Sequence, residues 1–136
     1  MIKAYKISML EKYAPFEAVK VAADYMNGTF GTVSGGVFTA GAAPTHFLYQ
    51  VGRGDENYTD FTIPKDSDAR AASLDVWNGK ELFIEGANLP ASVEEDSKLD
   101  FDANGALKVN ASPSGTYLQV TKLLGEGAVA VITKNA

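Results

Sequence analysis

Turn signals divide the chain into short runs in which apolar and polar residues alternate. Asn-Gly pairs occur three times, at residues 27–28, 78–79 and 104–105. Asn-Gly between alternating runs is a strong signal for a β-hairpin. Runs of this length and period indicate strands rather than helices. The pattern therefore predicts a mainly β fold, an antiparallel barrel or sandwich built from hairpins.

The hairpin around the third Asn-Gly pair has a register that can be derived from the sequence. A loop of residues 103–105 places four apolar side chains on one face of the sheet. The resulting cross-strand pairs are Leu99 with Val109 and Phe101 with Leu107. A two-residue loop would instead set acidic residues opposite apolar ones. The three-residue loop is therefore favoured, with its glycine in the left-handed region.

The same loop geometry, applied to the other two Asn-Gly pairs, predicts two further hairpins. Their registers pair Leu74 with Leu82, Ala72 with Ile84, and Val21 with Val33. A separate C-terminal hairpin is predicted to join residues 117–124 to residues 127–133. Its loop of two residues begins with glycine and would pair Val120 with Val131.

Two more strands are expected at residues 46–51 and 58–63, on either side of a polar, glycine-bearing loop. Residues 69–72 suit a short helix or a strand. Residues 17–26 are also ambiguous, because their alanines favour a helix while their valines alternate as in a strand.

The first sixteen residues have no cap and no clear period, and they are predicted to form an extended N-terminal arm. An arm with several large apolar residues must dock against something to become ordered. We therefore divide the chain into an arm of residues 1–16 and a single β-rich domain of residues 17–136, with at most a short helix. Deleting the arm is expected to leave the fold intact.

Composition and charge narrow the function classes. The 136 residues suit one domain, and the absence of cysteine removes disulfides and thiolate chemistry. The formal net charge of -5 is concentrated in residues 51–110, which carry six basic and thirteen acidic residues. Nucleic-acid binding requires a clustered basic patch, which the sequence lacks. No apolar stretch is long enough to cross a bilayer, and no secretory signal is visible, so no membrane partner is expected.

One stretch resembles half of a calcium-binding loop. Asp100, Asp102 and Asn104 followed by glycine match the first half of an EF-hand loop. The twelfth position of that loop needs a bidentate glutamate, and here it is Ala111. The hairpin explains the same residues, so no metal site is predicted.

Catalytic chemistry has little support in the sequence. His46 is the only histidine, and a packed, hydrogen-bonded side chain is a better interpretation than a catalytic base. An enzyme that uses His46 with an acidic partner is the third-ranked hypothesis. The carboxylates of residues 94–96 are expected to face water. We therefore predict neither an enzyme nor a cofactor.

Two features could mark a binding surface. Residues 53–55 spell Arg-Gly-Asp, an adhesion tripeptide that also occurs by chance in polar loops. Trp77, with Phe83 and Tyr58, forms either an exposed recognition patch or part of the packed sheet. The exposed arrangement would suit a carbohydrate- or ligand-binding β module, which is the alternative function.

The order of these turns and strands resembles small bacteriophage capsid decoration, or cement, proteins. The resemblance covers about residues 25–133 and rests on a pattern of turns and strands rather than on a chemical signature. Its stretches are residues 27–32 (NGTFGT), 75–82 (DVWNGKEL), 97–107 (SKLDFDANGAL) and 117–122 (YLQVTK).

The resemblance implies a structural protein made in the host cytoplasm and placed on the outer capsid surface of the virion. Its partner would be the major capsid protein, and its effect would be to stabilise the shell. Termini often make the capsid contacts in such proteins, which would give the N-terminal arm a role. The expected contact residues are Tyr5, Ile7, Met9, Tyr13 and Phe16. Whether the protein is a monomer or a homotrimer on the capsid stays open.

Overall fold

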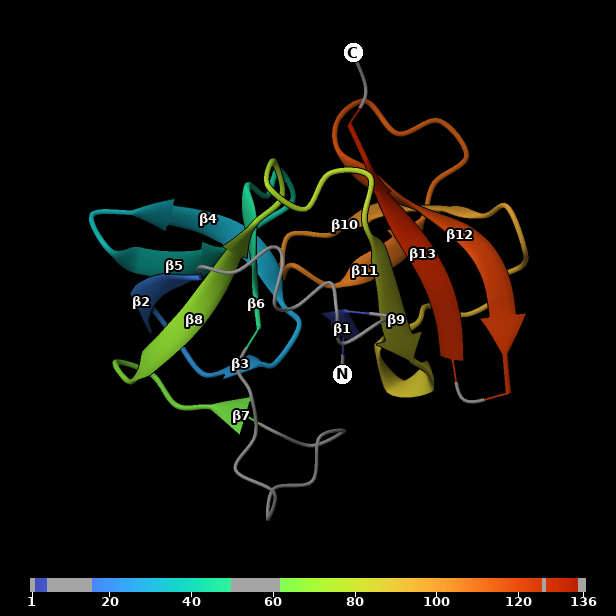
Figure 1. Ribbon diagram of the computed structural model, residues 1–136. Coiled ribbons are helices and arrows are strands. Elements are labelled where there is room, and N and C mark those ends of the chain that lie inside the picture. The colour runs from blue at the N-terminus through green and yellow to red at the C-terminus, as the bar shows by residue number, and fades with distance from the viewer. Residues whose placement is uncertain (1, 5–15, 50–61, 126, 135–136) are drawn as a thin grey trace.

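The computed structural model describes residues 2–4, 16–49, 62–125 and 127–134, and within them the protein is almost entirely β (Figure 1). The strands and the one short 3-10 helix of these residues are β1 (Ile2–Ala4), β2 (Glu17–Val21), β3 (Tyr25–Met26), β4 (Phe30–Ser34), β5 (Val37–Ala40), β6 (His46–Leu48), β7 (Thr62–Ile63), β8 (Asp68–Ser73), β9 (Glu81–Glu85), η1 (Gly86–Asn88), β10 (Lys98–Phe101), β11 (Leu107–Val109), β12 (Tyr117–Leu124) and β13 (Gly127–Thr133). The prediction of a mainly β fold with at most a short helix is confirmed.

The strands from the first half of the chain close into a small barrel. Its strand order is β2-β5-β4-β6-β8, with β8 returning to β2. The predicted antiparallel pattern holds for every pair except one, because β2 and β5 run parallel, with Lys20 beside Val37 and Val21 beside Phe38. The prediction that Val21 opposes Val33 is therefore wrong. Strand β5 lies between them, and Val33 pairs with Phe38.

A six-stranded antiparallel sheet lies beside the barrel, in the order β1-β9-β13-β12-β10-β11 (Figure 1). Its β10–β11 hairpin has the predicted register, with Leu99 opposite Val109 and Phe101 opposite Leu107. The backbone of Asp102 closes the turn through bonds with Gly105 and Ala106. Local alternation and turn chemistry were sufficient to fix this register.

The C-terminal hairpin also has its predicted two-residue loop, because Leu124 pairs with Gly127. The register changes by one residue further along, at a bulge between Val120 and Lys122. Val120 therefore pairs with Ala130. The predicted pairing of Val120 with Val131 is wrong. A bulge adds one residue to one strand and leaves the hydrophobic alternation on either side intact.

The second Asn-Gly pair does not close a hairpin. Strand β8 pairs with β2 and β6, whereas β9 pairs with β1 and β13, so the registers predicted between residues 72–74 and 82–84 are wrong. The connection instead carries the chain from the barrel to the sheet. It is fastened to β13, where Gly79 N–H donates to the Ile132 carbonyl at 2.7 Å.

The segments with ambiguous patterns are strands wherever the structure describes them. Residues 17–26 contain β2 and β3, and residues 69–72 lie in β8. The strand predicted at residues 46–51 is present as β6, and the end of the strand predicted at residues 58–63 is present as β7. Residues 50–61, which include the Arg-Gly-Asp sequence, lie outside the described residues.

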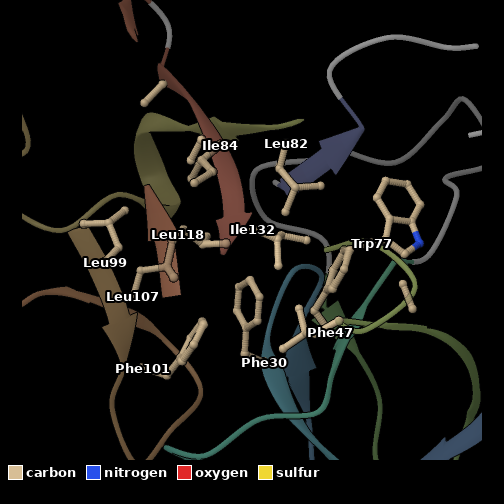
Figure 2. Packing of buried hydrophobic residues seen from close by; sticks show 14 of the residues in the cluster. Phe30, Phe47, Trp77, Leu82, Ile84, Leu99, Phe101, Leu107, Leu118 and Ile132 are labelled. Carbon is tan, nitrogen blue, oxygen red and sulfur yellow. The ribbon is translucent and has the colours of Figure 1, made fainter. Parts of the chain in front are cut away.

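One hydrophobic core joins the barrel to the sheet. Phe30 packs against Phe101 of the sheet at a ring-centroid distance of 4.5 Å and against Phe47 of the barrel at 5.5 Å (Figure 2). Burying a side chain of this size contributes about 1.5–3 kcal/mol to stability. We call the region where the two halves meet the seam. Its buried aromatic residues are Phe30, Phe47, Tyr49, Trp77 and Phe101.

A second, smaller cluster fills the barrel itself. It is built from the inward-facing residues of the barrel strands together with Ile63 of β7, and its largest ring is Phe38. Tyr25 packs on Phe38 edge to face, with ring centroids 5.6 Å apart. Strand β3 is thereby held against the barrel.

Gly105 brings the β10–β11 turn into direct contact with the barrel. Phe30 N–H donates to the Gly105 carbonyl at 3.0 Å. A Cβ atom at position 105 would lie 2.0 Å from the Phe30 carbonyl oxygen, and the residue has φ of +72°. Only glycine allows both this backbone conformation and this approach.

Candidate functional site

A groove of about 550 Å³ lies beside the seam. The β3–β4 turn and the end of β5 form one wall, and the chain after η1 and the β10–β11 turn form the other. Its larger side chains are Tyr25, Met26, Asn88, Leu89, Pro90, Asn104 and Leu107. A volume of this size is in the range of small-ligand sites. No sequence pattern predicted the groove, because it depends on how two distant turns meet.

The polar groups of the groove are partly engaged by the fold. The Tyr25 hydroxyl accepts a bond from Ala40 N–H at 3.2 Å and keeps its own proton for donation. Asp24 accepts a bond from Lys65 N–H at 2.7 Å through one carboxylate oxygen. The second oxygen of Asp24 and the exposed Asn104 amide add further acceptors and donors. The groove therefore presents both hydrogen-bond donors and acceptors at its surface.

The predicted N-terminal contact residues are only partly described. Tyr5, Ile7, Met9 and Tyr13 lie outside the described residues. Phe16 is half-buried, with its ring stacked on Tyr49 at 5.2 Å and tilted against Trp77 at 6.3 Å. It therefore packs against the main core.

Strand β1 is also part of the domain. Residues 2–4 extend the six-stranded sheet, with the backbone of Ala4 beside Leu82 of β9. Two parts of the predicted arm are thus integrated into the fold, one on the sheet and one at the seam. Deletion of residues 1–16 would remove both of them.

Trp77 does not form an exposed recognition patch, so that interpretation is wrong. Its side chain is 1% exposed and contacts Phe47 and Tyr49, each at 5.9 Å between ring centroids. Figure 2 shows it among the core residues of the seam. Phe83 is half-buried and Tyr58 lies outside the described residues. Trp77 therefore cannot contribute to an exposed aromatic surface with Phe83 and Tyr58.

His46 is a packed, hydrogen-bonded residue, as predicted. Its Nδ1 lies 2.8 Å from the Thr45 hydroxyl and its Nε2 lies 3.1 Å from a Glu17 carboxylate oxygen. The imidazole side chain is 13% exposed, and Glu17 is 55% exposed. The contact with Glu17 links β6 to β2.

The residues that resemble a calcium loop are used by the hairpin. One Asp102 carboxylate oxygen accepts bonds from Asn104 N–H at 2.8 Å and Ala106 N–H at 3.0 Å. Asp100 accepts a bond from the Asn110 amide at 2.6 Å. No group of three or more metal-ligating side chains occurs within the described residues. The carboxylates of residues 94–96 are exposed, as predicted.

Exposed apolar residues mark a second surface that sequence reasoning missed. Leu123 and Leu124, at the end of β12, are 43% and 39% exposed. The signal was present as two adjacent leucines at the end of an otherwise alternating strand. Whether these leucines are exposed depends on how far β10 extends along β12, and the sequence of β12 alone does not reveal that.

Comparisons of the chain with protein-family models, curated proteins and solved structures find no match. Among the described residues, no helix is long and apolar enough to span a membrane.

Proposed function

We propose that this chain is a structural binding protein, a phage head decoration protein that binds the major capsid protein and stabilises the shell. The observation that carries the proposal is the attachment of the N-terminal stretch at both of its ends. Residues 2–4 pair with β9, and Phe16 packs against Tyr49 and Trp77. The sequence between these attachments is rich in large apolar residues.

Attachment at both ends favours binding to a partner. Fixing both ends of a binding segment on a rigid domain reduces the conformational freedom that the segment loses on binding. Aromatic and methionine side chains, which this stretch supplies, are enriched at protein interfaces. Tyr5, Ile7, Met9 and Tyr13 are the residues that we expect to meet the capsid, with Phe16 supporting them from within the domain.

The stretches that resemble decoration proteins also meet in space. Phe30, Trp77 and Phe101 come from three of those four stretches, and all three are buried at the seam. The resembling pattern therefore supplies the contacts that hold the barrel to the sheet. This supports a common architecture as the source of the resemblance.

The test uses four serine substitutions that leave both attachments in place. The full-length variant Tyr5→Ser, Ile7→Ser, Met9→Ser and Tyr13→Ser is mixed with purified phage heads that lack a decoration protein. Co-sedimentation and light scattering then give the number of copies per head. The wild-type protein is expected to bind at a fixed copy number and the variant to bind at least tenfold more weakly, because anchor residues carry most of an interface's energy.

A matched control replaces four apolar residues at exposed positions elsewhere in the chain. Its substitutions are Met26→Ser, Val37→Ser, Val76→Ser and Val109→Ser, all at exposed positions. This control is expected to bind like the wild-type protein. Full occupancy by the N-terminal variant would reject the contact residues. A well-folded wild-type protein that ignores capsids would reject the decoration function itself.

The alternative function, a carbohydrate- or ligand-binding β module, now rests on the groove rather than on Trp77. Tyr25, Asp24 and Asn104 surround a hollow of about 550 Å³. An aromatic residue with amide and carboxylate groups is suited to a hydroxyl-rich ligand. Amide chemical shifts of the wild-type protein and of Tyr25→Ala should be followed by NMR with a glycan panel. Unmoved shifts around the groove would remove this alternative.

A further inference from the structure

The last four residues of β12 form an open sheet edge. Strand β10 pairs with β12 at Leu118 and Gln119, and the preceding turn covers Val120. Within the described ranges, no strand pairs with the outer side of residues 121–124. The edge is therefore open from the bulge to the hairpin loop.

This edge is exposed although the strand beside it is buried. All four of its residues are exposed, including Leu123 and Leu124, whereas Ala128 and Val129 of β13 are fully buried. An exposed sheet edge with apolar side chains is a template for pairing with another strand.

Hairpin geometry identifies the backbone groups that point outward. Leu124 and Gly127 flank a two-residue loop, so they form a hydrogen-bonded pair. The neighbouring pair of Leu123 with Ala128 is therefore non-bonded, which turns the N–H and C=O of Leu123 away from β13. Val120, the preceding outward residue, bonds to Ser97 O at 2.9 Å and to Asp96 N–H at 3.0 Å. Leu123 is thus the first outward residue beyond the covered part of the strand.

We propose that a second copy of this chain pairs with the β12 edge, antiparallel and about a two-fold axis at Leu123. Leu123 of each copy would donate its N–H to the Leu123 carbonyl of the other copy. The two Leu123 side chains would meet on one face of the joined sheets. On the other face, Leu124 of each copy would lie across from Lys122 of the other.

The sequence of the edge favours itself as the partner. A lysine on an edge strand commonly discourages pairing, but in this register Lys122 faces a leucine, and no like charges stand directly opposite each other. The aliphatic part of the lysine side chain can cover the leucine. In a two-fold pairing the β12 edge of each copy is covered by that of the other. Assembly therefore stops at a dimer and does not continue into a fibre.

The small size of the edge sets the strength of the dimer. Two strands of about four residues bury much less than the roughly 1,200 Å² of a stable interface, so association should be weak and concentration-dependent. This inference does not depend on capsid binding. It concerns a different surface from the N-terminal stretch.

The test is sedimentation velocity of the full chain from about 10 μM to about 1 mM, the range in which a weak interface becomes populated. The mean mass is expected to rise from 14.4 kDa toward twice that value. The variant Leu123→Pro removes an outward donor and leaves the bonds to β13 in place, so it should stay monomeric throughout. The control Val76→Ser, at an exposed apolar site elsewhere, should dimerise like the wild-type protein.

A second variant keeps the proposal testable if proline disturbs the fold. The chain has no cysteine, so Leu123→Cys introduces a single thiol at the predicted axis. Mild oxidation, or a short bifunctional thiol reagent, should yield a covalent dimer at least tenfold faster than with Val76→Cys. A monomer at all concentrations, a trimer mass, or equal cross-linking of the two cysteine variants would each overturn the proposal.

Discussion

Trp77 packs at the seam against rings of the barrel and of the N-terminal stretch. It is 1% exposed and contacts rings from both the N-terminal stretch and the barrel. Replacing it with alanine would leave a large cavity at the seam. We expect Trp77→Ala to lower the free energy of unfolding by about 3–5 kcal/mol.

Urea unfolding followed by circular dichroism measures this loss, with Val76→Ala as the control. Val76 is the neighbouring residue and is 52% exposed, so its substitution should have an effect within about 0.5 kcal/mol. Similar losses for the two variants would mean that Trp77 does not support the seam.

Alanine substitutions at Gly105 and Gly79 can be compared to separate the cost of backbone strain from the cost of steric contact. Both have positive φ, at +72° and +80°, but a Cβ at Gly79 meets open space while one at Gly105 meets the Phe30 carbonyl. Gly79→Ala should cost about 1–2 kcal/mol from the left-handed conformation alone. Gly105→Ala should cost clearly more, because the turn must also move away from β4. Equal thermal unfolding temperatures for the two variants would contradict this close approach.

Lys20 offers a test of surface electrostatics. The Asp68 carboxylate, 2.8 Å from the Lys20 ammonium group, raises the pKa of that group above its usual value. A raised lysine pKa gives a contribution to stability that is present below the ordinary pKa and is lost as pH rises through the folded-state pKa. NMR titration should therefore show a lower pKa for Lys20 in Asp68→Asn than in the wild-type protein. An unchanged pKa would show that the ion pair does not persist in solution.

At the scale of elements, the β10–β11 hairpin depends on a single carboxylate. One Asp102 oxygen holds two N–H groups of the turn, and hydrogen bonds to a charged group contribute about 1.5–3 kcal/mol each at most. Asp102→Ala should destabilise the protein by about 1–3 kcal/mol, whereas Asp102→Asn keeps an acceptor and should cost less. The comparison is made by chemical denaturation. Equal losses for the two variants would indicate that the charge, and not the acceptor position, stabilises the turn.

The hairpins also show which kind of pairing a sequence can reveal. Partners such as Leu99 and Val109 are close in sequence, so alternation and turn chemistry define their register. The segment of residues 72–84 carries the same Asn-Gly signal, yet its strands pair with different sheets. Pairing between distant strands is decided by which arrangement buries the whole core. A large apolar residue at a supposed turn tip, Trp77, was the local sign that this turn is covered.

The binding surfaces were less accessible from the sequence than the fold. The fold class follows from periodicity, whereas the groove exists only because the β10–β11 turn rests on β4 through Gly105 and Phe30. The open edge of β12 likewise exists because β10 begins only at Lys98, opposite Gln119. Both depend on the relative positions of elements, which periodicity does not encode.

At the scale of the whole molecule, the barrel and the sheet should unfold together. The main cluster takes residues from both halves, and no comparable cluster belongs to the sheet alone among the described residues. Tryptophan fluorescence and far-ultraviolet circular dichroism should therefore give coincident transitions in urea. Two separated transitions would show that the halves are independent folding units.

The place of β1 in the sheet has a consequence for the order of events during synthesis. The strands of the barrel all lie within residues 17–73, but β1 pairs with β9, and β9 also needs β13 at the C-terminal end. At about 5–20 residues per second, β13 leaves the ribosome roughly 3–12 s after β8. During that interval the barrel strands have emerged while the face bearing Phe30 and Phe47 still lacks its sheet. Strand β1 is therefore synthesised well before its partner β9 and before β13, and a nascent chain that has emerged only as far as residue 75 would expose an apolar barrel face to chaperones.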